Sequence, residues 1–295
     1  MAARTAVQAT ASFYAAGPGV RAFRWSLGAA QRLWPALAVR AAHRLFCTPL
    51  PPRWMQRRAD WGPHWRAERW PFEHANVTVH RQHPAAHAPL VLLAHGWGGH
   101  GGQMLTLAAA LAASGWQPVI LEMPAHGRSA GAHSSLPQFA RALDYVATRL
   151  QQQGHTLRAV VAHSLGANAA AFAASRGLAI DRLVLLAPPA SPRGYTRLFA
   201  AVFGLNEATR ARMQARIEAA EGALMAAFEP SAVGPRIAMP TLVVHDRQDS
   251  INRFVDGEAF TAAIDGARLV PTEGLGHRKL LHDADVVAQV VRFIR

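Results

Sequence analysis

Ser164 lies in a sequence context typical of a nucleophile. The motif Ala162-His163-Ser164-Leu165-Gly166 follows the apolar run Arg158–Val161 and opens a segment predicted to be helical. A serine on a sharp turn between a strand and a helix exposes its hydroxyl, which is the geometry of the G-x-S-x-G nucleophile elbow. Ala162 replaces the first glycine of that pattern. A serine that only caps a helix gives a similar string, so the motif needs catalytic partners elsewhere in the chain.

Two later segments could supply those partners, because a serine nucleophile needs a general base and the base needs an orienting carboxylate. His277 comes shortly after a strand predicted at Ala267–Val270. Asp246 and Asp249 follow a buried strand predicted at Thr241–Val244. Asp249 lies farther into its loop, so we expect Asp249 to orient His277, and Asp246 is the alternative.

A glycine-rich loop upstream could bind an oxyanion. The loop His95-Gly96-Trp97-Gly98-Gly99 directly follows a strand predicted at Leu90–Ala94. Acyl transfer needs preorganised N–H donors for the negative charge that develops on the carbonyl oxygen. We expect the amides of Trp97 and Leu165 to be these donors, with Gly96 allowing close approach of the backbone and His95 shaping the loop.

Short apolar runs alternate with amphipathic segments from residue 76 onward. Continuous apolar runs such as Leu90–Leu93 and Leu183–Leu186 are typical of strands buried on both faces of a parallel sheet. The alternation predicts a doubly wound α/β domain with its site at the carboxyl ends of the strands. The interval Ala187–Met239 carries no strand signal and is longer than a crossover needs, so we expect a small helical insertion at about 189–238. Further strands are predicted at Asn76–Arg81, Pro118–Glu122 and Arg158–Ala162, and helices at Gln103–Ala113, Leu136–Gln152, Gly166–Ser175 and Asp285–Ile294.

Positive charge is concentrated in the first 70 residues. The 295 residues carry a formal net charge of +13, and residues 1–70 hold eleven arginines against two acidic residues. Residues 71–295 hold 20 basic and 16 acidic residues, so the basicity belongs mainly to the N-terminal segment. No recognisable nucleic-acid-reading element accompanies it, and we do not expect a nucleic-acid partner.

The segment from Arg21 to Phe46 has a helical hydrophobic period. Its apolar residues recur in steps of three and four, and Pro35 is expected to open a second helix. One interpretation is a helical extension packed on the main domain with its arginines in water; the other is a basic amphipathic surface, within residues 1–59, for peripheral contact with anionic lipid. No stretch is long and apolar enough to span a bilayer, so we expect a cytoplasmic protein. The expected stripe consists of Phe23, Leu27, Ala30, Trp34, Leu37, Ala41 and Leu45.

The cysteine and histidine content bears on whether the chain has disulfides, metal sites or cofactors. Cys47 is the only cysteine, which excludes an internal disulfide and a cysteine-rich zinc site. Histidines 100, 126 and 133 lie on different loops and lack the spacing of zinc ligands, so neither a metal nor another cofactor is expected. The sequence does not set the oligomeric state.

Taken together, the motifs resemble the α/β-hydrolase superfamily of serine hydrolases, of the bacterial esterase-like or lysophospholipase-like kind. The order Ser164, Asp249, His277 is the order of that fold, and the spacing of Asp249 matches it. Ala125 stands where the Pro-x-His-Gly loop usually has glycine. The resemblance spans about residues 76–295 and rests on the loop at residues 95–99, Glu122–Ser129, the Ser164 elbow, Asp249 and Gly276-His277.

This resemblance implies an α/β-hydrolase fold in residues 71–295, with a helical cap insertion, behind an N-terminal helical extension over residues 1–70. It implies a cofactor-free hydrolase that cleaves a carboxylic ester, with an apolar acyl group, through an acyl-enzyme. Alternatives within the same chemistry are a thioester, an amide, a C–C bond or an acyl acceptor other than water. A non-catalytic binding protein on the same scaffold is an alternative of another class.

Overall fold

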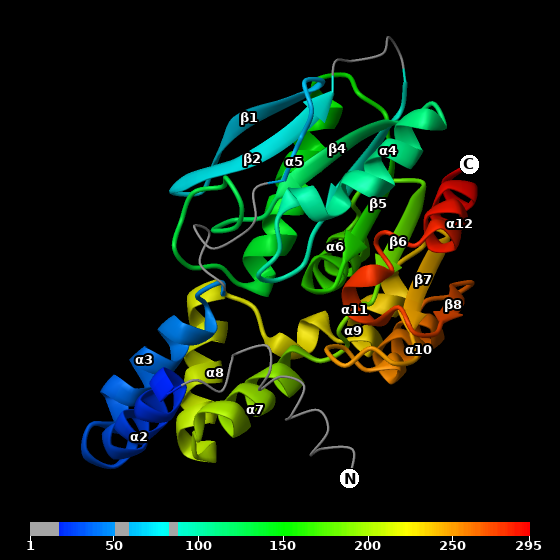
Figure 1. Cartoon of the computed structure of the whole chain (residues 1–295). Helices are drawn as coiled ribbons and strands as arrows, with labels where there is room; N and C mark the ends of the chain where they lie inside the picture. The colour runs from blue at the N-terminus through cyan, green and yellow to red at the C-terminus, as the bar shows by residue number, and fades with distance from the viewer. Residues whose placement is uncertain (1–17, 51–58, 83–87) are drawn as a thin grey trace. The chain divides into compact units, whose positions relative to one another are not determined.

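The computed structural model describes residues 18–50, 59–82 and 88–295 (Figure 1). The chain divides into two compact units. The helical unit consists of Met1–Thr48 and Ser191–Glu229, and the sheet unit consists of Pro49–Ala190 and Pro230–Arg295. Residues 1–17 and 51–58, which belong to the segment expected to contact lipid, lie outside the described residues.

The described part of the sheet unit is built on one eight-stranded sheet with the strand order β1-β2-β4-β3-β5-β6-β7-β8. The first two strands run antiparallel to their neighbours, and all other pairs are parallel. The expected mostly parallel sheet is therefore confirmed. The strands are β1 (Trp65–Phe72), β2 (Ala75–Gln82), β3 (Leu90–Ala94), β4 (Gln117–Glu122), β5 (Leu157–His163), β6 (Arg182–Leu186), β7 (Thr241–Asp246) and β8 (Arg268–Thr272).

Helices cover both faces of the sheet because its central strands are apolar on both sides (Figure 1). Helices α4 (Leu105–Ala113) and α12 (Ala284–Ile294) pack together on one face, against alternate residues of the strands. Helices α5 (Leu136–Gln152) and α6 (Leu165–Ser175) pack together on the other face. Short helices α9 (Pro230–Val233), α10 (Phe254–Ala263) and α11 (Gly276–Lys279) complete the unit. This layering brings the carboxyl ends of β3, β5, β7 and β8 to one edge.

The first strand differs from the sequence-based expectation. The domain boundary expected at residue 70 falls inside β1, which pairs along its whole length with β2. β1 is an edge strand, so it tolerates Pro71 and a mostly exposed, charged sequence. A strand of that kind lacks the apolar run that revealed the others. The break between the two units comes earlier, between Thr48 and Pro49.

The described part of the helical unit consists of helices and turns, with its own core. Helices α2 (Pro18–Leu33) and α3 (Pro35–Phe46) pack on α7 (Pro192–Phe203) and α8 (Glu207–Glu221). Gln31 ties α2 to the turn between α7 and α8, because its amide accepts from the N–H of Asn206 (2.7 Å) and donates to the carbonyl of Gly204 (3.1 Å). Buried members of this core include Leu27, Ala38, Ala42, Phe199, Phe203, Met213 and Met225.

The two helices expected on either side of Pro35 are present, but the expected stripe is only partly packed. Leu27 is buried, and Phe23, Ala30, Ala41 and Leu45 pack against the core, whereas Trp34 and Leu37 are exposed. The physical reason is the break at Trp34: a new helix begins at Pro35, so the helical phase counted from α2 does not continue into α3. No described helix is both long and apolar enough to cross a membrane.

Candidate active site

Ser164 occupies the sharp turn between β5 and α6. Its backbone angles are φ 54° and ψ −126°, a left-handed conformation that costs energy for any residue with a side chain. Gly166 is required beside it, because a Cβ there would lie 2.4 Å from the carbonyl oxygen of His95. Ala162 is fully buried in β5, so the methyl group that replaces the usual glycine is accommodated. The strained turn holds the hydroxyl at the carboxyl edge of the sheet.

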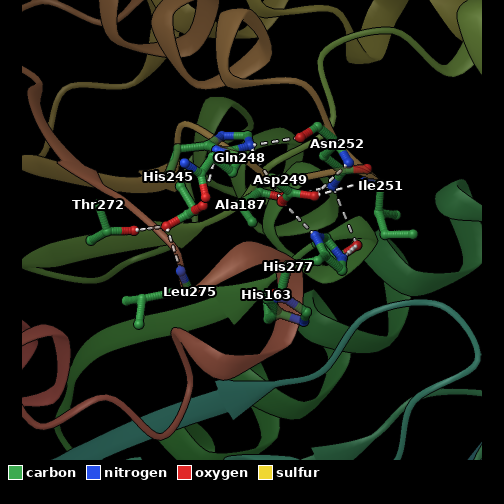
Figure 2. Close-up of polar contacts among 12 residues, drawn as sticks. His163, Ala187, His245, Gln248, Asp249, Ile251, Asn252, Thr272, Leu275 and His277 are labelled. Atoms are coloured by element: carbon green, nitrogen blue, oxygen red, sulfur yellow. Dashed lines mark hydrogen bonds and ion pairs between the residues drawn. The ribbon is translucent and has the colours of Figure 1, made fainter. Parts of the chain in front are cut away.

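The structure brings Ser164, His277 and Asp249 into hydrogen-bond contact. The Oγ of Ser164 lies 3.0 Å from Nε2 of His277. Nδ1 of His277 lies 2.7 Å from Oδ2 of Asp249 (Figure 2). The carboxylate accepts the Nδ1 proton, which leaves Nε2 free to accept from the serine hydroxyl. This arrangement is that of a nucleophile, a base and an orienting acid.

Asp249 is buried in a loop that supplies it with donors. Its Oδ1 accepts from the N–H groups of Ile251 (2.8 Å) and Asn252 (3.0 Å) (Figure 2). Nε2 of the buried His245 lies 3.5 Å from Oδ2. Burial alone would raise the pKa of the carboxyl, but the contacts with His245 and His277 outweigh it and hold the pKa well below its usual range. Asp249 therefore carries a negative charge beside His277 at neutral pH.

Asp246, the alternative acid, makes a different set of contacts. It accepts from the hydroxyl of Thr272 (2.8 Å) and from the N–H groups of Leu275 (3.0 Å) and Gln248 (2.9 Å). Burial raises the pKa of Asp246, and these donors lower it overall. Asp246 thus anchors the segment that leads to His277, while Asp249 contacts the imidazole itself.

His163 contacts the segment that carries His277. Its Nε2 donates to the carbonyl oxygen of His277 across 2.8 Å, and the two rings lie 4.6 Å apart. Burial and the neighbouring His277 hold the pKa of His163 well below its usual value, so the ring is neutral. From sequence we expect a structural role for His163, since adjacent residues on a sharp turn point apart; the direct contact with His277 is not visible in the sequence.

Asn252 is a further site residue that sequence patterns do not reveal. Its side-chain amide donates to the carbonyl of Ala187 (2.7 Å) at the end of β6 and lies 3.4 Å from Oγ of Ser164. The backbone carbonyl of Asn252 accepts a hydrogen bond from Nε2 of His245 (3.1 Å). Asn252 therefore connects the acid loop to the neighbouring strand exit, which requires β6 and β7 to be adjacent.

The glycine-rich loop after β3 lies against the nucleophile. A Cβ on Gly96 would lie 2.6 Å from Cβ of Ser164, so only glycine allows this approach. Nδ1 of the buried His95 donates to the carbonyl of Gly96 (2.7 Å), and its Nε2 accepts from the N–H of Met123 (3.1 Å). Burial lowers the pKa of His95 to about 4, which keeps it neutral. His95 thus contacts the backbone of the loop and of the segment after β4.

The two amides expected to bind an oxyanion remain available. Leu165 is the first residue of α6, so the helix provides no acceptor for its N–H. The N–H of Trp97 has no acceptor among the described residues, whereas the N–H of Gly98 donates to Nε2 of His126 (3.0 Å). The half-buried Trp97 ring packs against His126 and Phe139. The loop is therefore fixed through Gly98, beside a free Trp97 amide.

The segment after β4 supports that loop from the other side. The buried Glu122 accepts from the N–H groups of Gly101 (3.1 Å) and Arg128 (2.6 Å) and lies 3.2 Å from Nε2 of His80. Ala125 has φ 63°, the conformation that favours the glycine usual in related loops. Among the described residues, no cluster of histidine, cysteine and acidic side chains could hold a metal ion.

Comparisons with known proteins agree with this geometry. Residues 85–219 match the model of a hydrolase family described as serine aminopeptidase, S33. This range includes the glycine-rich loop and Ser164 and ends before Asp249 and His277. No curated protein sequence matches the chain.

Solved structures with the same fold cover most of the chain. An esterase of Pyrococcus furiosus is 15% identical and superposes with a TM-score of 0.62, over 81% of this chain and 97% of that one. Est1E of Butyrivibrio proteoclasticus, solved with ferulic acid, is 18% identical with a TM-score of 0.60, over 77% and 96%. The thioesterase domain of the curacin biosynthetic pathway is 22% identical with a TM-score of 0.56, over 78% and 99%. The chain therefore has the α/β-hydrolase fold, and residues 85–219 of it match a hydrolase family.

Proposed function

We propose that this protein hydrolyses a carboxylic ester through an acyl-enzyme formed on Ser164. The observation that carries the proposal is the unbroken contact from Ser164 Oγ through His277 to Asp249, at 3.0 and 2.7 Å. A hydroxyl is a weak nucleophile until an adjacent base can take its proton. Nε2 of His277 lies at the right distance to do so, and the contact of Nδ1 with Asp249 favours the tautomer that leaves Nε2 as the acceptor.

The proposed reaction has two halves that use the same groups. Ser164 Oγ attacks the acyl carbon while its proton passes to Nε2 of His277, and the carbonyl oxygen becomes negative. Collapse of this intermediate breaks the ester bond, and His277 returns the proton to the leaving alcohol. A water molecule then attacks the acyl-enzyme with the same proton transfers, which releases the acid and restores Ser164.

The amides of Leu165 and Trp97 are proposed to bind the oxyanion. Both N–H groups flank Ser164, one on the following residue and one on the loop that Gly96 holds against it. Fixed dipoles of this kind need no reorganisation as the charge develops. The neutral state of His95 helps, because the loop is then held by hydrogen bonds that place no additional charge beside the oxyanion.

The acyl group is proposed to be apolar. The support is the half-buried indole of Trp97, next to Gly96 and packed on Phe139. Met213, Met225 and Phe228 of the insertion are buried inside the helical unit, so they give no support to this part of the proposal. Activity over esters of graded acyl chain length tests this part, and a preference for acetyl over longer chains would contradict it.

Labelling with a fluorophosphonate and assay of an ester panel test the mechanism. We expect label on Ser164, and a Ser164→Ala variant should lose the label and at least about a thousandfold in kcat/KM. Ser175→Ala, at the far end of the same helix α6, is the matched control and should keep both. Hydrolysis that survives Ser164→Ala in folded protein would reject the proposal.

Thioester cleavage is the alternative that a specific observation favours. The neighbour from the curacin pathway is a thioesterase domain, and the oxyanion and triad geometry suits a thioester equally well. Matched ester, thioester and amide substrates with one acyl group separate the hydrolytic possibilities. Adding a competing alcohol would reveal acyl transfer, and a diketone substrate would reveal C–C cleavage. A binding protein without catalysis would show none of these activities and no label.

Location is part of the proposal. We propose a cytoplasmic protein that contacts the inner face of the membrane peripherally. Fractionation of cells with and without a high-salt wash tests it, because charge-dependent contact is screened by salt.

A further inference from the structure

The turn between α2 and α3 exposes apolar side chains to an unusual degree. Leu33 is 64% exposed, Trp34 62% and Leu37 49%, and Trp25 on α2 is 80% exposed. Trp34, Leu37 and Arg40 line one shallow hollow. Contiguous exposed apolar groups rimmed by polar ones mark interaction sites on soluble domains. We call Leu33, Trp34 and Leu37 the apolar face of the helical unit.

This face belongs to helices that are firmly packed on their other side. Leu27 lies two residues from Trp25, about 200° around the helix, and is buried among Phe199 and Phe203. Ala38 and Ala42 of α3 are fully buried on the side away from Leu37. The exposed residues are therefore held outward by an ordered core.

The charged side chains of the two helices that carry the apolar face are all positive. Residues 18–50 contain no aspartate or glutamate. Arg32, Arg40 and Arg44 are exposed, and none of them forms an ion pair with a described residue. On α3, Arg40 and Arg44 lie on the side opposite Ala38 and Ala42, as Leu37 does. Cationic and apolar groups thus share the outer side of the same helix.

We propose that this face docks on an anionic lipid surface. Trp34, Leu33 and Leu37 would enter the boundary between headgroups and acyl chains, where tryptophan is favoured, and Arg32, Arg40 and Arg44 would contact lipid phosphates. No described helix can span a bilayer, so the contact is with its surface. The proposal does not depend on the hydrolysis of any ester.

Charge and chemistry argue against other occupants. A second copy docked through the same face would bring its unpaired arginines against these ones, since a two-fold interface pairs identical patches. A single-stranded nucleic acid would use the tryptophans for stacking but would leave Leu33 and Leu37 without an apolar environment. A lipid surface offers phosphates to the arginines and an apolar environment to the leucines.

Sedimentation with vesicles tests the proposal on the full chain. We expect binding to mixed vesicles of phosphatidylglycerol and phosphatidylcholine, release by salt, and little binding to phosphatidylcholine alone. Arg40→Gln with Arg44→Gln should weaken partition by about 25-fold, since each arginine near an anionic surface contributes about fivefold. Trp34→Ser with Leu37→Ser should weaken it by about tenfold or more.

Matched controls use exposed residues outside the two helices that carry the face. Leu224→Ser with Val255→Ser removes two exposed apolar side chains, and Arg212→Gln with Arg236→Gln removes two exposed charges. Both should bind vesicles as the parent does. Thermal unfolding confirms that every variant is folded, and activity on a water-soluble ester should be unchanged in all of them.

Several outcomes would overturn the proposal. Equal loss in the charge controls would mean that net charge alone drives binding. Vesicle binding that survives both test variants would place the contact elsewhere. Dissociation of a dimer by Trp34→Ser with Leu37→Ser would assign the face to a second copy, and binding of a single-stranded oligonucleotide but not of vesicles would assign it to nucleic acid. A Ser164→Ala variant that binds vesicles but is inactive separates this proposal from the catalytic one.

Discussion

The sheet unit buries a set of histidines, whereas the two N-terminal helices of the helical unit expose arginines. In the sheet unit, His80, His95, His126, His163 and His245 are all buried, with at most 3% of each residue exposed. In the helical unit, Arg24, Arg32, Arg40 and Arg44 of α2 and α3 are exposed. Burial lowers the pKa of His95 and His163, and a neutral ring can hold a backbone group in one position, whereas an exposed guanidinium keeps its charge.

The buried histidines and the exposed arginines have different structural roles. The buried histidines of the sheet unit fix the glycine-rich loop, the acid loop and the His277 segment by specific hydrogen bonds. Arg210 is an exception in the helical unit, since it is buried and bonded to Glu207, Thr196 and Gln214. Geometry is therefore controlled inside the sheet unit, and surface chemistry is presented by the helical unit.

The largest expected effect comes from removing the charge that orients His277. Asp249→Asn should lower kcat by about three to four orders of magnitude, because the amide no longer favours the proton on Nδ1. Asp246→Asn is the matched control, since the same change three residues away removes only an anchor of Thr272 and Leu275. We expect that variant to lose about 1–3 kcal/mol of stability and much less activity. Steady-state kinetics and urea unfolding of both variants measure this, and a larger loss of kcat for Asp246→Asn would reassign the acid.

The second largest expected effect is that the free energy of unfolding depends on pH through the buried histidines. In the unfolded chain His95 titrates near 6.5, but burial lowers its pKa to about 4 in the folded protein. The unfolded state binds more protons between these values, so the free energy of unfolding should fall as pH drops from about 6.5 to about 4. His95 alone accounts for about 3 kcal/mol, and the lowered pKa of His163 acts in the same direction.

Urea unfolding across this pH range measures the effect. His95→Gln should flatten the dependence, although its stability at pH 7 will also be lower because the loop loses contacts. Replacement of the exposed His133 by glutamine serves as the control and should leave the slope of the parent. If the slope is unchanged in His95→Gln, groups other than His95 set the pH dependence of the free energy of unfolding.

Sequence patterns predict the sheet and the meeting of Ser164, Asp249 and His277 for the same reason. Each of these residues comes after an apolar strand, and parallel strands end at one edge, so their meeting follows from topology. The sequence favours Asp249 over Asp246 because Asp249 lies farther into the loop, and in the structure Asp249 is the one of the two that contacts the His277 ring.

What escaped prediction depends on neighbours that are distant in sequence. Asn252 bonds to Ala187 only because β6 and β7 are adjacent, and the contact of His163 with His277 depends on where α11 lies relative to β5. The exposure of Trp34 and Leu37 depends on the new helical phase that starts at Pro35. Helical periodicity cannot reveal such a break in phase when the apolar spacing happens to continue across it.

A smaller effect is expected where His163 supports the base without touching substrate. His163→Phe removes the donor to the His277 carbonyl, and we expect kcat to fall about tenfold with KM unchanged, in line with the loss of one buried hydrogen bond. His163→Gln keeps an N–H donor and should recover part of the loss. A change in KM alone would contradict a role in positioning His277.

The smallest effects come from two helical glycines that contrast the units directly. Gly28 in α2 has no atom within 4 Å of the position of a Cβ, whereas a Cβ on Gly166 in α6 would collide with the carbonyl of His95. Gly28→Ala should raise the free energy of unfolding by about 0.5–1 kcal/mol, because the unfolded chain loses more conformational freedom. Gly166→Ala should lower it by about 1–3 kcal/mol and reduce kcat, since the elbow and the glycine-rich loop must move apart. Urea unfolding of both variants measures this. The same substitution in a helix should change the free energy of unfolding in opposite directions at the two positions. A change of the same sign in both variants would mean that helix propensity, rather than the close approach to Ser164, sets the outcome.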